Sequence, residues 1–102
     1  MDLEAIKAAV REGRFIISSH ADQEAAAEEI DIAEIREALL HSEVLEVYPD
    51  TGRGESCLVL GFAGARPIHV VCGWRQEKVV VITVYVPKMP KFQDPRTRWR
   101  LG

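Results

Sequence analysis

Two polar ring side chains inside apolar segments can carry acid–base chemistry in this sequence. His69 interrupts the apolar run "PIHVVCG", and Tyr85 lies in the later run "VVVITVYV". A buried histidine needs a hydrogen-bond partner for each ring nitrogen that water does not reach. If the two runs are neighbouring strands, a turn of two or four residues puts His69 opposite Val84, and a three-residue turn puts it opposite Thr83 or Tyr85. A lone strand histidine is more often structural, so both roles stay open for His69.

Two further candidates lie at predicted element boundaries. His20 falls in "ISSHADQEAAAEEI", between an apolar run and an acidic, helix-like stretch. Its ring can bond backbone groups left free at a helix start, or it can belong to a site. Arg66 precedes Pro67, which favours an extended backbone at Arg66 and leaves its side chain free to reach outward. That position suits a cation that binds a negatively charged group.

The cysteines and histidines do not predict a metal site. Cys57 and Cys72 lie in apolar, strand-like runs, which is typical of reduced core residues. The sequence has no C-x-x-C motif, and the histidines at positions 20, 41 and 69 do not fall at a ligand spacing. We therefore expect neither a metal nor a cofactor.

The charge is divided unequally along the chain. Residues 1–50 carry 13 acidic and 4 basic side chains, a net charge of −9, whereas residues 51–102 carry 9 basic and 3 acidic side chains, a net charge of +6. The basic half can offer a surface to a polyanion, or it can attract the acidic helices within one compact domain.

The tail at residues 88–102 concentrates this positive charge. Its prolines indicate an extended arm rather than a regular strand. With Phe92 and Trp99, the arm can bind RNA through charge and stacking, or it can act as a latch that packs on the domain. The predicted RNA-binding residues are Lys88, Lys91, Arg96, Arg98 and Arg100.

The hydrophobic period changes once, from helical to strand-like. Helical spacing predicts a first helix over about residues 2–12, and the β-branched "RFIISS" predicts a strand. Ser18 or Ser19 can cap a second, alanine-rich helix that ends near Glu29, and Asp31 with Glu34 predicts a capping box for a third. Strand patterns then follow in "VLEVYP", "SCLVLGFA", "RPIHVVCGW" and "KVVVITVYVP". The predicted class is α+β, with N-terminal helices packed on a mainly antiparallel sheet of about four strands.

Length and hydropathy limit the organisation. With 102 residues, the chain suits a single domain. The longest apolar runs are far shorter than the roughly 20 residues that cross a bilayer, and the N-terminus lacks the pattern of a signal peptide. We expect a cytoplasmic protein.

The succession "FIISSHA", "IDIAEIREAL", "CLVLGFAGARPIHVV" and "VVVITVYVP" resembles a bacterial family of small domains of unknown function. That family's pattern is F-S-x-H-A, an R-G-I-S-type helix boundary, G-R-P-L-H-V-V and V-I-T-V-Y-x-P. The family is similar to RelE/BrnT-like toxins. In those toxins N-terminal helices pack on an antiparallel sheet, and the proteins cleave messenger RNA without a metal. The resemblance puts His20, Arg66, His69 and Tyr85 on characteristic positions. Where the family often has Arg-Gly at the helix boundary, this chain has Glu28-Glu29.

Three functions remain open. The first is a metal-independent endoribonuclease, with His69 or His20 as base or acid, Arg66 and a tail arginine as a charge clamp, and Tyr85 as a donor or stacking surface. The second is a non-catalytic module that binds a partner protein, such as an antitoxin, through its sheet and acidic helices. The third is a small-molecule binder with a cavity beneath the helices.

Overall fold

The computed structural model of the chain describes residues 1–50, 52, 54–88 and 92–98. Within these residues the fold is α+β, with three helices and a five-stranded mixed sheet. The elements are α1 (Leu3–Arg11), β1 (Phe15–Ile17), α2 (Ser19–Ala27), α3 (Ile32–Leu40), β2 (Ser42–Tyr48), β3 (Ser56–Ala63), β4 (Arg66–Arg75), β5 (Lys78–Tyr85), β6 (Phe92–Asp94) and β7 (Thr97–Arg98).

The sheet has the strand order β1-β5-β4-β3-β2, so it differs in strand number from the predicted sheet of about four strands. Five strands replace the expected four, because the short β1 adds to the edge of the predicted meander. It pairs in parallel with β5, with Phe15 opposite Val79. The other pairs are antiparallel. The chain leaves β1 through two helices and enters the sheet again at its opposite edge, in β2.

Local capping explains where each helix begins. The Asp2 carboxylate accepts from the Glu4 and Ala5 amides at the start of α1, and the Ser18 hydroxyl accepts from the Ala21 amide at the start of α2. At α3, Asp31 and Glu34 form the reciprocal capping box that the sequence predicted.

Helix α2 ends in a turn that normally favours glycine. The Ile30 amide donates to the Ala25 carbonyl and the Glu29 amide donates to the Ala26 carbonyl, while Glu29 has φ 56°. This is the Schellman arrangement, which places its left-handed residue directly after the helix cap. Glu29 therefore occupies the position where the related pattern has glycine, and the carbonyls of Glu28 and Glu29 need partners from elsewhere.

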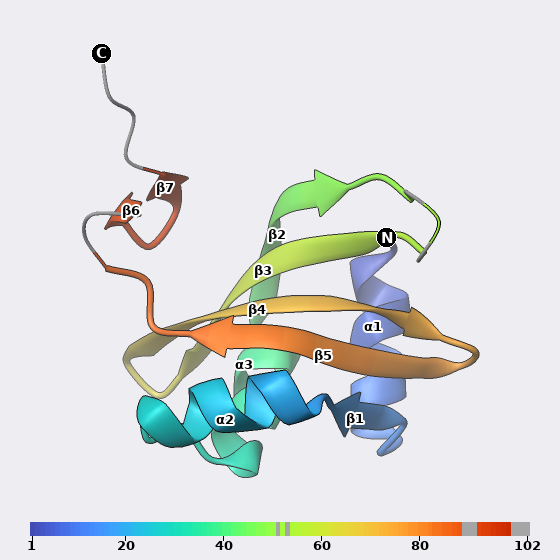
Figure 1. Cartoon of the computed structure of the whole chain (residues 1–102), viewed down its shortest axis with the longest axis horizontal. Helices are drawn as coiled ribbons and strands as arrows, with labels where there is room; N and C mark the ends of the chain where they lie inside the picture. The colour runs from blue at the N-terminus through green and yellow to red at the C-terminus, as the bar shows by residue number, and fades with distance from the viewer. Residues whose placement is uncertain (51, 53, 89–91, 99–102) are drawn as a thin grey trace.

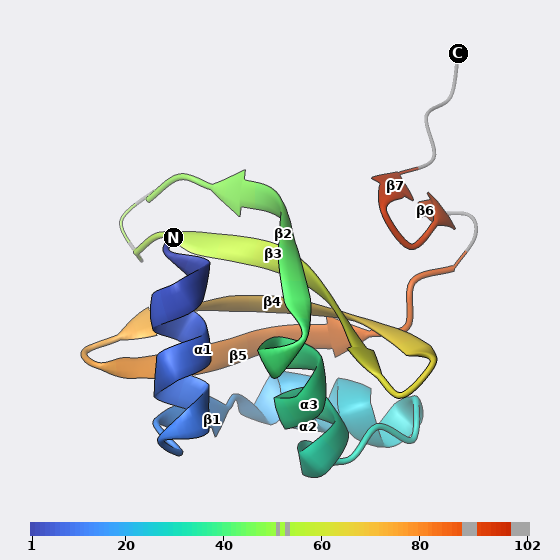
Figure 2. The ribbon, with the colours of Figure 1, turned by 180° about the vertical axis from the view of Figure 1, so that it is seen from behind.

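The helices cover one face of the sheet. Helices α1 and α3 lie behind the sheet in Figure 1 and in front of it in Figure 2, whereas α2 runs along the β5 edge. The core between helices and sheet includes Ile6 and Leu39 from the helices and Val59 and Val70 from the sheet. Helix α3 lies so close to β3 that a Cβ atom added at Gly61 would be 2.7 Å from the Cα atom of Ala38.

A β-bulge decides the register between β4 and β5. The turn has two residues, Gln76 and Glu77, because Arg75 pairs with Lys78. That turn alone would put His69 opposite Val84. The pairing shifts by one between Cys72 and Val71, and the extra residue on β5 is Ile82. As a result His69 lies opposite Tyr85.

The C-terminal arm contains a short hairpin, so the expectation that its prolines exclude a strand was wrong. Strands β6 and β7 pair across a turn in which the Asp94 carboxylate accepts from the Arg96 and Thr97 amides, each at 2.9 Å. Pro95 follows Asp94 in this turn, where its restricted φ suits the second turn position. Both views show the hairpin at one corner of the sheet, apart from the helices (Figures 1 and 2).

Candidate functional site

His69 lies in the sheet face that points away from the helices, which we call the open face. Its neighbours on β4, Ile68 and Val70, belong to the helix-side core, so the alternation of a strand turns His69 to the opposite side. Leu60 lies beside it on β3 and Tyr85 on β5. Although this face carries no helix, His69 is fully buried.

Both ring nitrogens of His69 are hydrogen-bonded. Nδ1 lies 3.2 Å from the Tyr85 hydroxyl, and Nε2 lies 2.5 Å from the backbone carbonyl oxygen of Pro95. The two rings meet edge to face, with centroids 5.2 Å apart. A carbonyl can only accept, so Nε2 carries a proton, and in the neutral ring Nδ1 accepts from the Tyr85 hydroxyl. The Tyr85 hydroxyl oxygen can also accept a hydrogen bond from Nδ1–H. If Nε2 loses its carbonyl partner, the proton of the neutral ring can therefore lie on either nitrogen.

The turn of the C-terminal hairpin closes the space above His69. The Pro95 carbonyl bonds the ring, and the next residue, Arg96, makes a 2.6 Å ion pair with Glu43 on β2. Glu43 pairs with Leu60, which in turn pairs with His69. Two polar contacts therefore hold the hairpin against the open face.

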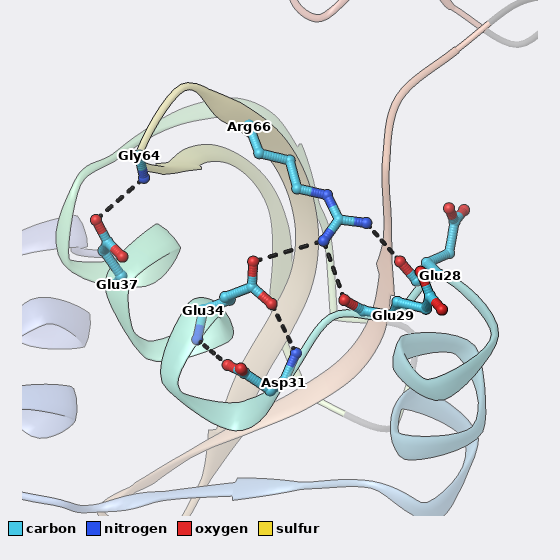
Figure 3. A network of polar contacts seen from close by, with 7 residues as sticks. All are labelled: Glu28, Glu29, Asp31, Glu34, Glu37, Gly64 and Arg66. Carbon is cyan, nitrogen blue, oxygen red and sulfur yellow. Dashed lines mark hydrogen bonds and ion pairs between the residues drawn. The ribbon is translucent and has the colours of Figure 1, made fainter.

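Arg66 lies on the other face of β4. It lies three positions before His69, and an odd spacing along a strand changes the face. Its guanidinium donates to the carbonyls of Glu28 and Glu29, the latter at 3.1 Å, and lies 3.5 Å from the Glu34 carboxylate (Figure 3). The arginine thus supplies the partners that the end of α2 lacks. The sequence suggested that this side chain was free, but it is committed to the junction of α2 and α3.

His20 does not cap α2, because Ser18 does. The His20 ring is largely exposed, with 68% of its side chain accessible, and its Nε2 lies 3.3 Å from the Glu24 carboxylate one turn later. Glu24 accepts from the Val84 amide at 3.2 Å, and the Ser18 hydroxyl donates to the Ile82 carbonyl. These bonds fasten α2 to the edge of β5 beyond the end of β1. Sequence reasoning missed this role of Glu24, since no local signal links a helix residue to that edge.

The structure therefore brings together two of the four predicted catalytic residues, His69 and Tyr85. Among the predicted RNA-binding residues, Lys88 is exposed and lies 3.8 Å from the Glu28 carboxylate, and Arg96 pairs with Glu43. Lys91 and Arg100 lie outside the described residues, and of Arg98 the backbone alone is described, in β7.

A groove continues the open face beyond His69. It has a volume of about 420 Å³ and includes Ser56, Gly73 and Val80, which form one row across three strands. Tyr48 and Arg75 also line it. Gly73 is four residues from His69 on β4, which corresponds to about 13 Å along a strand.

The cysteines are core residues, as the sequence predicted. Cys57 and Cys72 are free, fully buried and directly paired across β3 and β4, with their sulfurs 4.0 Å apart. The hydrogen bond with Cys57 and burial raise the pKa of the Cys72 thiol. Within the described part of the chain, no three His, Cys, Asp or Glu side chains gather as metal ligands, and no helix is long and apolar enough to cross a membrane.

Residues 17–86 match a protein family described as "Domain of unknown function (DUF4258)". The chain belongs to this family. The matched segment begins at the end of β1 and finishes just after β5, so it includes the His69–Tyr85 pair and the Arg66 junction. No curated protein and no solved structure matches the chain.

Proposed function

We propose that the open face binds single-stranded RNA and cleaves it without a metal, with His69 and Tyr85 as the proton-transfer groups. The observation that carries this proposal is the hydrogen bond between the His69 Nδ1 atom and the Tyr85 hydroxyl. It orients the ring so that Nε2 points at the turn of the hairpin, where a substrate would take the place of the Pro95 carbonyl. The resemblance of the sequence to RelE/BrnT-like toxins supports the same chemistry.

The reaction needs one proton removed and one returned. With Nδ1–H donating to the Tyr85 oxygen, the Nε2 lone pair accepts the proton of a ribose 2′-hydroxyl. The 2′-oxygen then bonds to the adjacent phosphorus as the bond from phosphorus to the 5′-oxygen breaks. The leaving oxygen takes the proton of the Tyr85 hydroxyl, and the Nδ1 proton of the now positively charged His69 replaces it, which returns the histidine to its neutral form. The products are a 2′,3′-cyclic phosphate and a 5′-hydroxyl.

The proposal also needs a cation for the phosphate and a surface for the rest of the RNA. Arg96 lies next to Pro95 on the hairpin, and we assign it to stabilise the charge developing on the phosphate. The groove, whose Gly73 lies about 13 Å along β4 from His69, would hold nucleotides further along the RNA. Arg66 acts in the fold instead, because it bonds the carbonyls at the end of α2, and the exposed His20 contacts Glu24 one turn later in the same helix.

The test is cleavage of end-labelled single-stranded RNA in the presence of EDTA. His69→Ala and Tyr85→Phe should each slow cleavage by about a hundredfold. The matched control is His41→Ala, because His41 is an exposed histidine at the end of α3. Glu43→Gln removes the ion pair that holds Arg96 but keeps every basic residue, so it should leave cleavage intact or accelerate it. Equal cleavage by the wild type and His69→Ala would reject the proposal.

A second candidate is a non-catalytic protein-interaction module. It is favoured by the fact that His69 and Arg66 each bond a distant segment of the chain. In that case His69→Ala costs about 1 to 3 kcal/mol of unfolding free energy, because it leaves buried partners unsatisfied, and there is no cleavage to lose. The buried contacts of His69 predict this loss for both candidates, so the cleavage assay on the same variants separates them, and urea denaturation shows how much of each variant is folded.

A further inference from the structure

An apolar groove crosses the outer surface of the helical layer, between α2 and the start of α3. Its volume is about 480 Å³. Ala25, Ile30 and Ile35 are buried and form its base, whereas Ile32 is 58% exposed at its side. An isoleucine with that much accessible surface is a large apolar contact that the fold itself does not use.

The sequence builds this groove from small side chains and two caps. Helix α2 presents alanines here, including the exposed Ala26, and these short side chains leave a hollow beside the helix. The Schellman turn brings Ile30 back over Ala25, and the Asp31 capping box then starts α3 at once. Ile32 becomes the first residue of α3 and stands beside the hollow that the alanines leave.

Carboxylates lie at the groove without a basic side chain beside them among the described residues. Asp22 and Asp31 line it, the exposed Glu29 follows the end of α2, and no lysine or arginine lines it. Within the described residues, no base lies at ion-pair distance from these three carboxylates. The bases that do reach this region, Arg66 and Lys88, are paired with Glu34 and Glu28.

We propose that the groove between α2 and α3 binds a lysine- or arginine-rich amphipathic helix of a partner protein. An apolar side chain of that helix would pack against Ile32 and Ala26, and its cations would face Asp22, Glu29 and Asp31. The same carboxylates repel RNA and anionic lipids. The groove lies on the helical layer, whereas His69 lies on the open face of the sheet, so this surface does not depend on RNA cleavage.

The probe is a synthetic 18-residue helix with leucines at helical spacing and lysines elsewhere, beside the same design with glutamates in place of the lysines. Binding to the full chain is followed by calorimetry, and the contacted residues by amide NMR shifts. The lysine peptide should bind and shift the signals of Ala26 and Ile32, and higher salt should weaken it. The glutamate peptide should not bind.

Paired variants separate the groove from general attraction to an acidic protein. Ile32→Ser should weaken binding by about tenfold, since burial of an isoleucine side chain stabilises by about 1.5 kcal/mol or more. Val47→Ser is the control, because Val47 is similarly exposed, at 55%, on β2. Asp22→Asn with Glu29→Gln should weaken binding more than Glu4→Gln with Glu77→Gln, which removes the same charge elsewhere. Unchanged binding by Ile32→Ser, or equal losses in both charge pairs, would overturn the proposal whatever the RNA assay shows.

Discussion

Replacing Arg66 by methionine tests whether this residue stabilises the fold or acts on a substrate. Methionine keeps an unbranched apolar stem but removes the guanidinium. The carbonyls of Glu28 and Glu29 then lose their donor at the end of α2, and Glu34 loses a cation at 3.5 Å. The structure assigns every one of these contacts to the junction between α2 and α3 (Figure 3).

The magnitude follows from the exposure of the site. A hydrogen bond from a charged donor contributes about 1.5 to 3 kcal/mol when buried. The Arg66 side chain is 34% exposed, so water replaces part of each bond, and the Glu34 ion pair adds less than about 1 kcal/mol. We expect Arg66→Met to lower the free energy of unfolding by about 2 to 3 kcal/mol. For a domain of this size, that is a fall in Tm of about 10 to 20 °C.

Urea denaturation followed by circular dichroism measures this effect. Arg66→Lys should recover only part of the loss, because an ammonium group cannot reproduce the fork that reaches both carbonyls. Arg75→Met is the matched control, since Arg75 is exposed at the other end of β4 and should change stability by less than about 0.5 kcal/mol. If Arg66→Met is as stable as the wild type but loses RNA cleavage, the guanidinium acts on substrate and the structural interpretation is wrong.

Three further predictions concern the backbone and one loop. Glu29→Gly should stabilise the protein by about 0.5 to 1 kcal/mol, because Glu29 has a φ of 56° that glycine adopts without strain. Thermal denaturation measures the gain, and a loss of stability would argue against the left-handed turn. Gly61→Ala should lower the free energy of unfolding measured in urea by about 3 kcal/mol or more, since the new Cβ atom meets the Ala38 backbone. Gly73→Ala should lower it clearly less, because a Cβ atom there lies 3.1 Å from the Glu55 carbonyl oxygen. The Gly52 and Gly54 amides lower the pKa of Asp50 below its usual 3.8, so its contribution to stability is present above that pH and is lost as the pH falls through the folded-state value. The difference in stability between the wild type and Asp50→Asn should therefore shrink on acidification from about pH 5 to pH 2, and a constant difference would show that the carboxylate charge is not involved.

The helices could be predicted because their signals are local. Asp31 and Glu34 are three residues apart, and that spacing is enough to form the capping box that begins α3. The serine ahead of α2 and the apolar period of α1 act over equally short distances. The same holds for Cys57 and Cys72, whose apolar neighbours already indicated the core.

The candidate site depended on contacts between distant parts of the chain. The turn between β4 and β5 has the two residues that would set His69 opposite Val84, but the bulge at Ile82 moves the register to Tyr85. A bulge adds one residue to one strand, and its position depends on packing across the sheet, which hydrophobic period does not encode. The partner of the other His69 nitrogen, the Pro95 carbonyl, comes from the tail.

The sequence by itself determined the order of the elements from α1 to β5 and the helix starts, because propensity, capping and apolar period act within a few residues. The tertiary structure alone decided which polar groups meet. It joined Arg66 to carbonyls 37 and 38 residues earlier in the chain, and it joined His69 to Tyr85 and to the Pro95 carbonyl. Such contacts form only when several elements pack at once, since every buried or half-buried polar group must find a partner in the completed fold.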